Sequence, residues 1–210
     1  MLDLAEYVRF LITLLAILDP FAAIPMFLAL TAGQSPVDRE WTARAAALTV
    51  IAVLLGAALT GETFLTLVGA SLASFQVGGG IVLLLMALSM LEARVSRVRQ
   101  TDSEVEEAES RRSVGAVPIG LPLLAGPGSI SAVIIERKQA EGFGHLVAIT
   151  LVILLISAAV YIALRLAGPI GAKLGTIGLN ILNRLFGLLL AAIAISTIAA
   201  GLKALFPALG

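Results

Sequence analysis

Long apolar stretches without charge recur along this chain, and short joints rich in Gly, Ser, Pro or charged residues separate them. A helix needs about 20 apolar residues to cross the hydrocarbon core of a bilayer. Stretches near that length predict six transmembrane helices, at residues 7–30, 42–59, 75–91, 114–135, 145–164 and 183–205. The first has Asp3 and Glu6 before Arg9 in place of the basic segment of a secretory signal, so we expect it to be retained.

The composition also indicates a membrane protein. Of the 210 residues, 59% are hydrophobic and 13% are charged, with a mean hydropathy of +1.04, whereas about a quarter of the residues in a soluble domain are charged. The net charge is zero and the basic residues are dispersed. We therefore expect the lipid bilayer, and no nucleic acid, as a partner.

The residue types of common catalytic sites are scarce. There is no cysteine, and His145 is the one histidine, so thiolate and imidazole metal sites are not expected. His145 lies at a predicted helix end, and we assign it no role. The sequence has no phosphate-binding loop, no His-Glu-x-x-His and no Gly-x-Ser-x-Gly motif. We expect no enzyme and no resident cofactor, and coupling of transport to H⁺ or Na⁺ stays open.

A charged segment divides the chain into two units. Residues 92–113 hold 11 of the 28 charged residues and no long apolar run, which predicts a solvated, partly helical connector. Residues 1–91 and 114–210 then form two units with three predicted helices each. A shift of 107 residues aligns these units, and it places Asp19-Pro20 on Gly126-Pro127, Gln76 on Asn183 and Gly80 on Gly187.

The repeat predicts a topology. Because each unit has an odd number of helices, the second would cross the membrane with opposite polarity, as in many secondary transporters. The predicted fold is an all-α membrane protein with six transmembrane helices in two inverted three-helix repeats. The predicted loops on the side of the termini hold 4 of the Lys and Arg residues and the other side holds 10. Basic residues concentrate in cytoplasmic loops, so we expect both termini to lie outside.

The first and fourth predicted helices carry signals of a break near mid-membrane. Asp19 is the only charged residue between Phe10 and Val37, and Pro20 follows it directly. The fourth helix contains Pro122 and the run Gly126-Pro127-Gly128. Proline removes a hydrogen-bond donor and clashes with the preceding turn. The freed backbone groups must then face protein or a wet cavity, and a carboxylate at that depth is a functional candidate by default.

Two such breaks would form a binding site. The N–H groups that start a half-helix bind anions, and the carbonyls that end one bind cations, so a small zwitterion suits both. The predicted substrate-binding residues lie at the two breaks or at the matched amides: Asp19, Pro20, Phe21, Ala22, Ala23, Gly126, Pro127, Gly128, Ser129, Gln76 and Asn183. Asp19 is also the predicted ion-coupling residue. The alternative is that the prolines and glycines are packing kinks and that Asp19 is a satisfied helix cap.

Four segments resemble the signatures of the MarC family of integral membrane proteins. They are LDPFAAIPMFLALT at residues 18–31, PLLAGPGSI at 122–130, GGI at 79–81 and NRLFG at 183–187. The resemblance implies a six-span, multi-pass protein of the prokaryotic cytoplasmic (inner) membrane. It also implies transport, since some members carry small neutral amino acids such as glycine and alanine.

The resulting hypothesis is a secondary transporter of small neutral amino acids that works by alternating access. The alternatives are a membrane scaffold or sensor that transports nothing, and a transporter of another small solute or ion. A divalent ion is disfavoured, because one intramembrane carboxylate is a poor cage for it.

Overall fold

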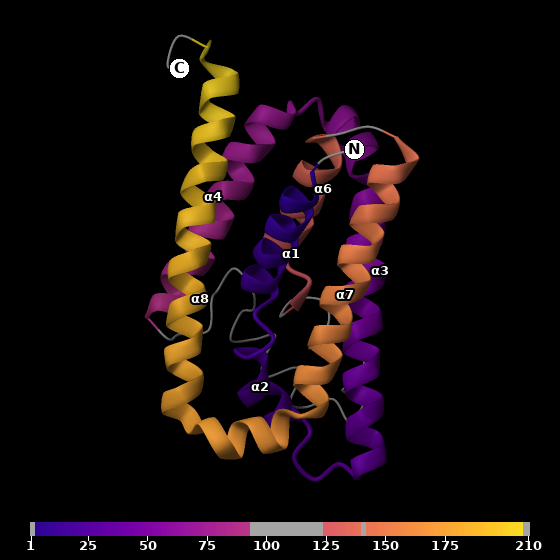
Figure 1. Ribbon diagram of the computed structural model, residues 1–210, viewed down its shortest axis with the longest axis vertical. Coiled ribbons are helices and arrows are strands. Elements are labelled where there is room, and N and C mark those ends of the chain that lie inside the picture. The colour runs from indigo at the N-terminus through magenta and orange to yellow at the C-terminus, as the bar shows by residue number, and fades with distance from the viewer. Residues whose placement is uncertain (1–2, 93–123, 140–141, 208–210) are drawn as a thin grey trace.

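The computed structural model describes residues 3–92, 124–139 and 142–207. Every regular element in these residues is an α-helix (Figure 1). In chain order they are α1 (Leu4–Leu18), α2 (Ala23–Leu30), α3 (Pro36–Val68), α4 (Leu72–Leu91), α6 (Pro127–Gln139), α7 (Phe143–Arg165) and α8 (Ala167–Leu205).

Local capping chemistry sets where α3 and α4 begin. The Ser35 hydroxyl accepts the Asp38 N–H, and Pro36 occupies the first helical position, where its missing N–H is not needed. The Ser71 hydroxyl accepts the Ser74 N–H in the same way at the start of α4. Gly69 ends α3 with φ 70°, a left-handed conformation that glycine adopts without steric cost. Although these joints are short, α4 packs mainly against α8, and α3 packs mainly against α7.

The long helices α3, α4, α7 and α8 run along the length of the molecule, and the shorter α1, α2 and α6 lie among them (Figure 1). α8 starts as a segment across one end and then turns at Gly175, where φ is 59° and ψ is −178°. The N- and C-termini lie at the same end (Figure 1).

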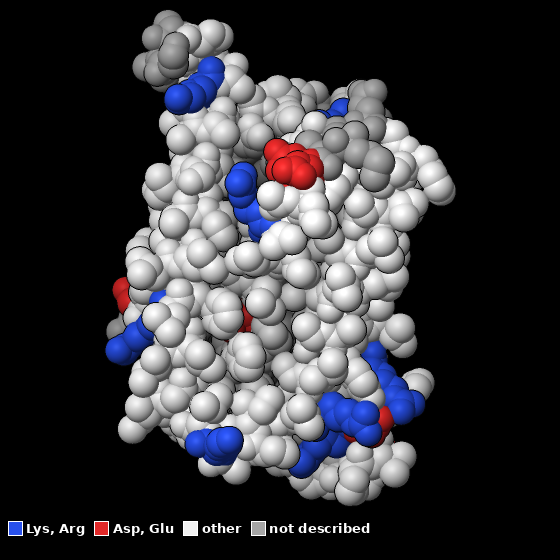
Figure 2. All heavy atoms as spheres, in the orientation of Figure 1, with Lys and Arg blue, Asp and Glu red and all other residues white. Residues whose placement is uncertain are grey.

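The outer surface of the bundle is apolar. Only 22% of the residues in the most apolar 18-residue stretch of α8 are buried. Leu151 and Leu155 on α7 and Ile181 on α8 are each more than half exposed. Helices this apolar on their outward faces belong in lipid. Most charged side chains on the face shown in Figure 2 lie toward the two ends, and the largely uncharged surface between them is interrupted by a charged patch at the left edge and a small acidic spot near the centre.

Among the described residues, four helices are long and apolar enough to cross a membrane, namely the stretch Pro36–Gly61 of α3 together with α4, α7 and α8. Counting the bent pair α1 and α2 as one broken span gives five. α3 and α8 are longer than the predicted helices 42–59 and 183–205, because α3 includes the polar segment 36–41 and α8 includes residues 167–182, which contain the turn at Gly175. Of the predicted helix 114–135, residues 114–123 lie outside the described residues, as do residues 93–113 of the connector. The six-span arrangement and the inverted repeat stay predictions.

Candidate functional site

The first predicted break is present. α1 ends at Leu18 and α2 begins at Ala23, with an angle of 48° between them. Among the described residues Asp19 is the only non-glycine residue with positive φ, at 39°. Pro20 cannot donate to the preceding turn, so the chain leaves the helix there. The Asp19 N–H still bonds to the Leu15 carbonyl oxygen, at 3.0 Å.

The Asp19 side chain is fully buried and belongs to this break. Its Oδ1 accepts the N–H of Ala22 at 3.2 Å, immediately before α2 begins. The carboxylate therefore satisfies a backbone donor that Pro20 and the helix start leave without an intrahelical partner. The structure therefore contains the helix cap of the alternative hypothesis. The same cap holds a carboxylate between the half-helices α1 and α2.

The second break is described from its helix-starting side. α6 begins at Pro127, and the Ser129 hydroxyl donates to the Gly126 carbonyl oxygen at 2.9 Å. Ser129 and Gly128 are buried, whereas Pro127 is exposed. Pro122, predicted to take part in this break, lies outside the described residues.

The two breaks meet. A Cβ added to Gly128 would lie 3.5 Å from Cγ2 of Ile17 in the last turn of α1. The same Cβ would lie 2.8 Å from Sδ of Met86 and 2.9 Å from Cδ2 of Leu83, both on α4. The start of α6 therefore packs against the end of α1, with α4 closing one side. Only a residue without a side chain fits there without displacing its neighbours.

α8 contributes to the same region. The rings of Phe21, in the first break, and Phe186 stack with centroids 6.0 Å apart and planes at 10°. Asn183 precedes Phe186 by three positions, so the two residues share a face of α8. The Oδ1 of Asn183 is buried and has no hydrogen-bond partner among the described residues. A buried amide oxygen without a partner is a candidate for contact with a ligand.

Gln76 lies elsewhere, although the repeat pairs it with Asn183. Its Cβ would lie 3.0 Å from a Cβ added to Gly201, near the end of α8. Gln76 precedes Met86 by ten residues, which is about 15 Å along α4. The structure thus places it in the contact between α4 and α8, toward the end that holds the termini. Among the predicted site residues, residues 19–23 and 126–129 lie at the two breaks, whereas Gln76 does not.

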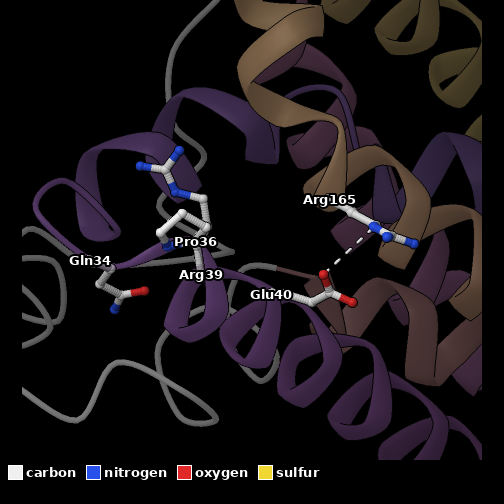
Figure 3. Close-up of a pocket in the computed structure, with 5 residues that line it drawn as sticks. All are labelled: Gln34, Pro36, Arg39, Glu40 and Arg165. Atoms are coloured by element: carbon white, nitrogen blue, oxygen red, sulfur yellow. Dashed lines mark ion pairs between the residues drawn. The ribbon is translucent and has the colours of Figure 1, made fainter.

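A cavity of about 450 Å³ lies at the opposite end, where α3 begins and α7 ends (Figure 3). It is lined by Gln34, Pro36, Arg39, Glu40 and Arg165, none of which is a predicted site residue. Glu40 accepts hydrogen bonds from Arg44 at 2.6 Å and from the Tyr161 hydroxyl at 2.9 Å, and Arg165 lies 3.8 Å away. This cluster joins the start of α3 to the end of α7.

The MarC family sequence model, described as "MarC family integral membrane protein", matches residues 4–206. The chain belongs to the MarC family. The UPF0056 membrane protein YhcE of Escherichia coli (strain K12) is 34% identical to it over 207 residues, which cover 99% of this chain and 96% of YhcE. The UPF0056 membrane protein MJ1677 of Methanocaldococcus jannaschii is 35% identical over 206 residues, covering 96% of this chain and 98% of MJ1677.

The family membership confirms the resemblance and makes the chain a multi-pass integral membrane protein of a prokaryotic family. The UPF0056 membrane protein YvbG of Bacillus subtilis (strain 168) is also similar, at 32% identity over 203 residues that cover 96% of each chain. No solved structure matches this chain. In the part of the MarC-family chain that the structure describes, no group of three or more His, Asp or Glu residues is arranged to hold a metal ion.

Two features of this MarC-family chain escaped the sequence analysis. Phe186 stacks on Phe21 in the first break. Its spacing of three residues from Asn183 puts both on one helix face, and this spacing is the sequence pattern that could have indicated Phe186. His145 is fully buried beside Tyr7, 138 positions earlier in the sequence. No local pattern pairs residues so far apart.

Proposed function

We propose that this protein is a secondary transporter of small neutral amino acids whose binding site is the pair of helix breaks. The observation that carries this proposal is the contact of Gly128, at the start of α6, with Ile17 in the last turn of α1. A helix start and a helix end then face one region, as in transporters that bind substrates at discontinuous helices.

The chemistry of the two ends suits a zwitterion. The first N–H groups of α6 carry partial positive charge and would bind a carboxylate. The end of α1 carries partial negative charge, and the buried Asp19 carboxylate adds a full charge beside it. Both would attract an ammonium group. The Ser129 hydroxyl donates to Gly126 and keeps lone pairs that can accept from that group.

The size of the neighbouring residues favours a small substrate. Ala22, Ala23, Gly128 and Ser129 bring little side-chain volume to the two breaks, and Gly128 is already in contact with Met86 and Leu83. Glycine and alanine, which the family resemblance implies, fit a site of this kind. Alternating access would follow if the half-helices at the two breaks move relative to α4 and α8.

The competing hypothesis is a packed membrane protein that transports nothing. It is supported by the full burial of Asp19 and by the hydrogen bond from the Ala22 N–H. The two hypotheses differ in one measurable property, which is saturable flux of a small neutral amino acid.

The test is uptake of labelled glycine and alanine into proteoliposomes, with and without imposed proton and sodium gradients. Substitution of Asn183 by Leu, next to the breaks, should raise KM about tenfold if the amide contacts substrate. The matched control is Gln76→Leu, because the structure places that amide in the contact between α4 and α8. An absence of saturable flux for every neutral amino acid would refute the proposal.

Asp19→Asn tests the coupling role separately. Asparagine tolerates positive φ and its Oδ1 can still accept the Ala22 N–H, so the break keeps its shape while the charge is lost. We expect the variant to bind substrate more weakly and to lose its response to the coupling gradient. If the response to the gradient is unchanged, Asp19 is not the coupling residue.

A further inference from the structure

Three helices contribute buried polar groups that lie close together at the end that holds the termini. Tyr7 comes from α1, Glu136 from α6 and His145 from α7, and their exposed fractions are 9%, 7% and 0%. The Tyr7 hydroxyl oxygen lies 2.8 Å from Nδ1 of His145. Nε2 of the same ring lies 3.0 Å from the backbone carbonyl oxygen of Glu136. The cluster therefore connects α1, α7 and α6.

The hydrogen-bond partners of His145 determine its tautomer. A carbonyl oxygen only accepts, so Nε2 must carry a hydrogen and donate it to Glu136. In a neutral ring Nδ1 is then the acceptor, and the Tyr7 hydroxyl donates to it. Both ring nitrogens therefore have a hydrogen-bond partner.

The Glu136 carboxyl is less well satisfied. Gln139 Nε2 donates to its Oε2 at 3.2 Å, but its Oε1 is buried with no hydrogen-bond partner among the described residues. A buried carboxylate oxygen without donors is costly, and a proton on the carboxyl removes the charge. The geometry is therefore that of a carboxylic acid rather than of a carboxylate.

Among the described residues, few charged side chains lie near Glu136. Glu6 and Arg9 on α1 act on Glu136 with opposite signs, and Arg137 and Lys138 follow it on α6. On α7, His145 faces the end of α6. On α3, Gly61 lies against Ile134 of α6, and on α4, Gly79 lies against Ser131 of α6. Glu136 lies one residue beyond the predicted span 114–135. Burial first, then Glu6, raises its pKa to about 7, and Arg9 acts in the opposite direction.

We propose that Glu136 is a proton-binding site that closes this end of the protein. With the proton bound, the end of α6 stays buried against α1 and α7 through Tyr7 and His145, as in this structure. Without the proton, the carboxylate needs water, and the end of α6 separates from its neighbours to reach it. The site lies eight residues from Gly128, which is about 12 Å along one continuous helix. This proton site is distinct from the helix breaks and does not require that the protein transports amino acids.

Infrared spectroscopy of the purified full-length protein tests proton binding directly. A carbonyl stretch of a protonated carboxylic acid should persist above pH 6 and disappear around pH 7. It should be absent in Glu136→Gln and present in Glu40→Gln, the control carboxyl at the opposite end. If Glu136→Gln does not fold, Gln139→Ala serves instead, because loss of the amide donor to Oε2 should shift the band. A wild-type band that is gone by pH 5, or that Gln139→Ala leaves in place, would overturn the proposal.

Cysteine labelling tests the closure, since the chain has no cysteine of its own. Ile135→Cys reports on a buried position beside Glu136, and Phe143→Cys, which is 81% exposed, corrects for ionisation of the thiol itself. The ratio of the two labelling rates should rise about tenfold between about pH 6 and about pH 8. It should stay constant in Glu136→Gln. Tyr7→Phe should raise the ratio at every pH. A wild-type ratio that is independent of pH contradicts the proposal.

Discussion

The contact between α4 and α8 allows a prediction with a matched control two residues away. A Cβ added to Gly80 would lie 2.6 Å from Cγ1 of Ile198 and 3.1 Å from both the Ala194 carbonyl oxygen and the Ile198 backbone nitrogen. Two of these atoms are backbone, and Cγ1 of Ile198 can move only by a change of χ1, which is strongly restricted for isoleucine in a helix. A Cβ added to Gly78 would meet nothing within 4 Å. Gly80→Ala should therefore push the two helices apart, whereas Gly78→Ala should not.

The expected size follows from two opposing effects. Replacing a helical glycine by alanine favours the helix by about 0.8–1 kcal/mol, and both variants share this gain. Overpacking a close contact costs about 1–3 kcal/mol, and only Gly80→Ala incurs it. The unfolding free energies of the two variants should therefore differ by about 1–3 kcal/mol, with Gly78→Ala the more stable.

The assay is reversible unfolding in mixed micelles, followed by the helical circular dichroism signal. Ile198→Ala removes the nearest of the three atoms, so the double variant with Gly80→Ala should recover part of the loss and show a coupling free energy above about 0.5 kcal/mol. Equal stability of Gly78→Ala and Gly80→Ala would mean that α4 and α8 do not approach as closely as described.

Three further predictions concern the proton site and the first break. The folded pKa of Glu136, about 7, exceeds its ordinary value of 4.5, so the folded state holds a proton that the unfolded state releases. Stability should therefore fall as pH rises from about 4.5 to about 7, by roughly 3 kcal/mol. In Glu136→Gln, unfolding titrations at pH 4.5 and pH 8 should lack this difference; a difference of equal size would exclude Glu136 as its source. Asp19→Ala should be about 1–2 kcal/mol less stable than Asp19→Asn, since alanine loses the acceptor for the Ala22 N–H and tolerates φ 39° poorly; equal unfolding midpoints would contradict the capping role. Phe186→Leu should cost about 1 kcal/mol through loss of the stack on Phe21, and an unchanged midpoint would show that the stack contributes nothing.

The sequence by itself determined the features that depend on local chemistry. Apolar length predicts helices that suit a bilayer, and the helices α3, α4, α7 and α8 have that length. The break after Asp19 follows from the missing N–H of Pro20, and the start of α6 at Pro127 follows from the proline and glycines around it. These properties arise within a few residues of the chain, so the local sequence is enough to predict them.

Only the tertiary structure decided which residues are neighbours. Gln76 and Asn183 are amides at matched positions, yet Gln76 packs against Gly201, whereas Asn183 shares a face of α8 with Phe186, which stacks on Phe21 in the first break. His145 looked like an interfacial residue, but helix packing buries it against Tyr7. A helix pattern states which residues share a face, whereas the partner of that face depends on how several helices pack together. Side-chain fit between distant segments, such as Gly128 against Ile17, settles that choice.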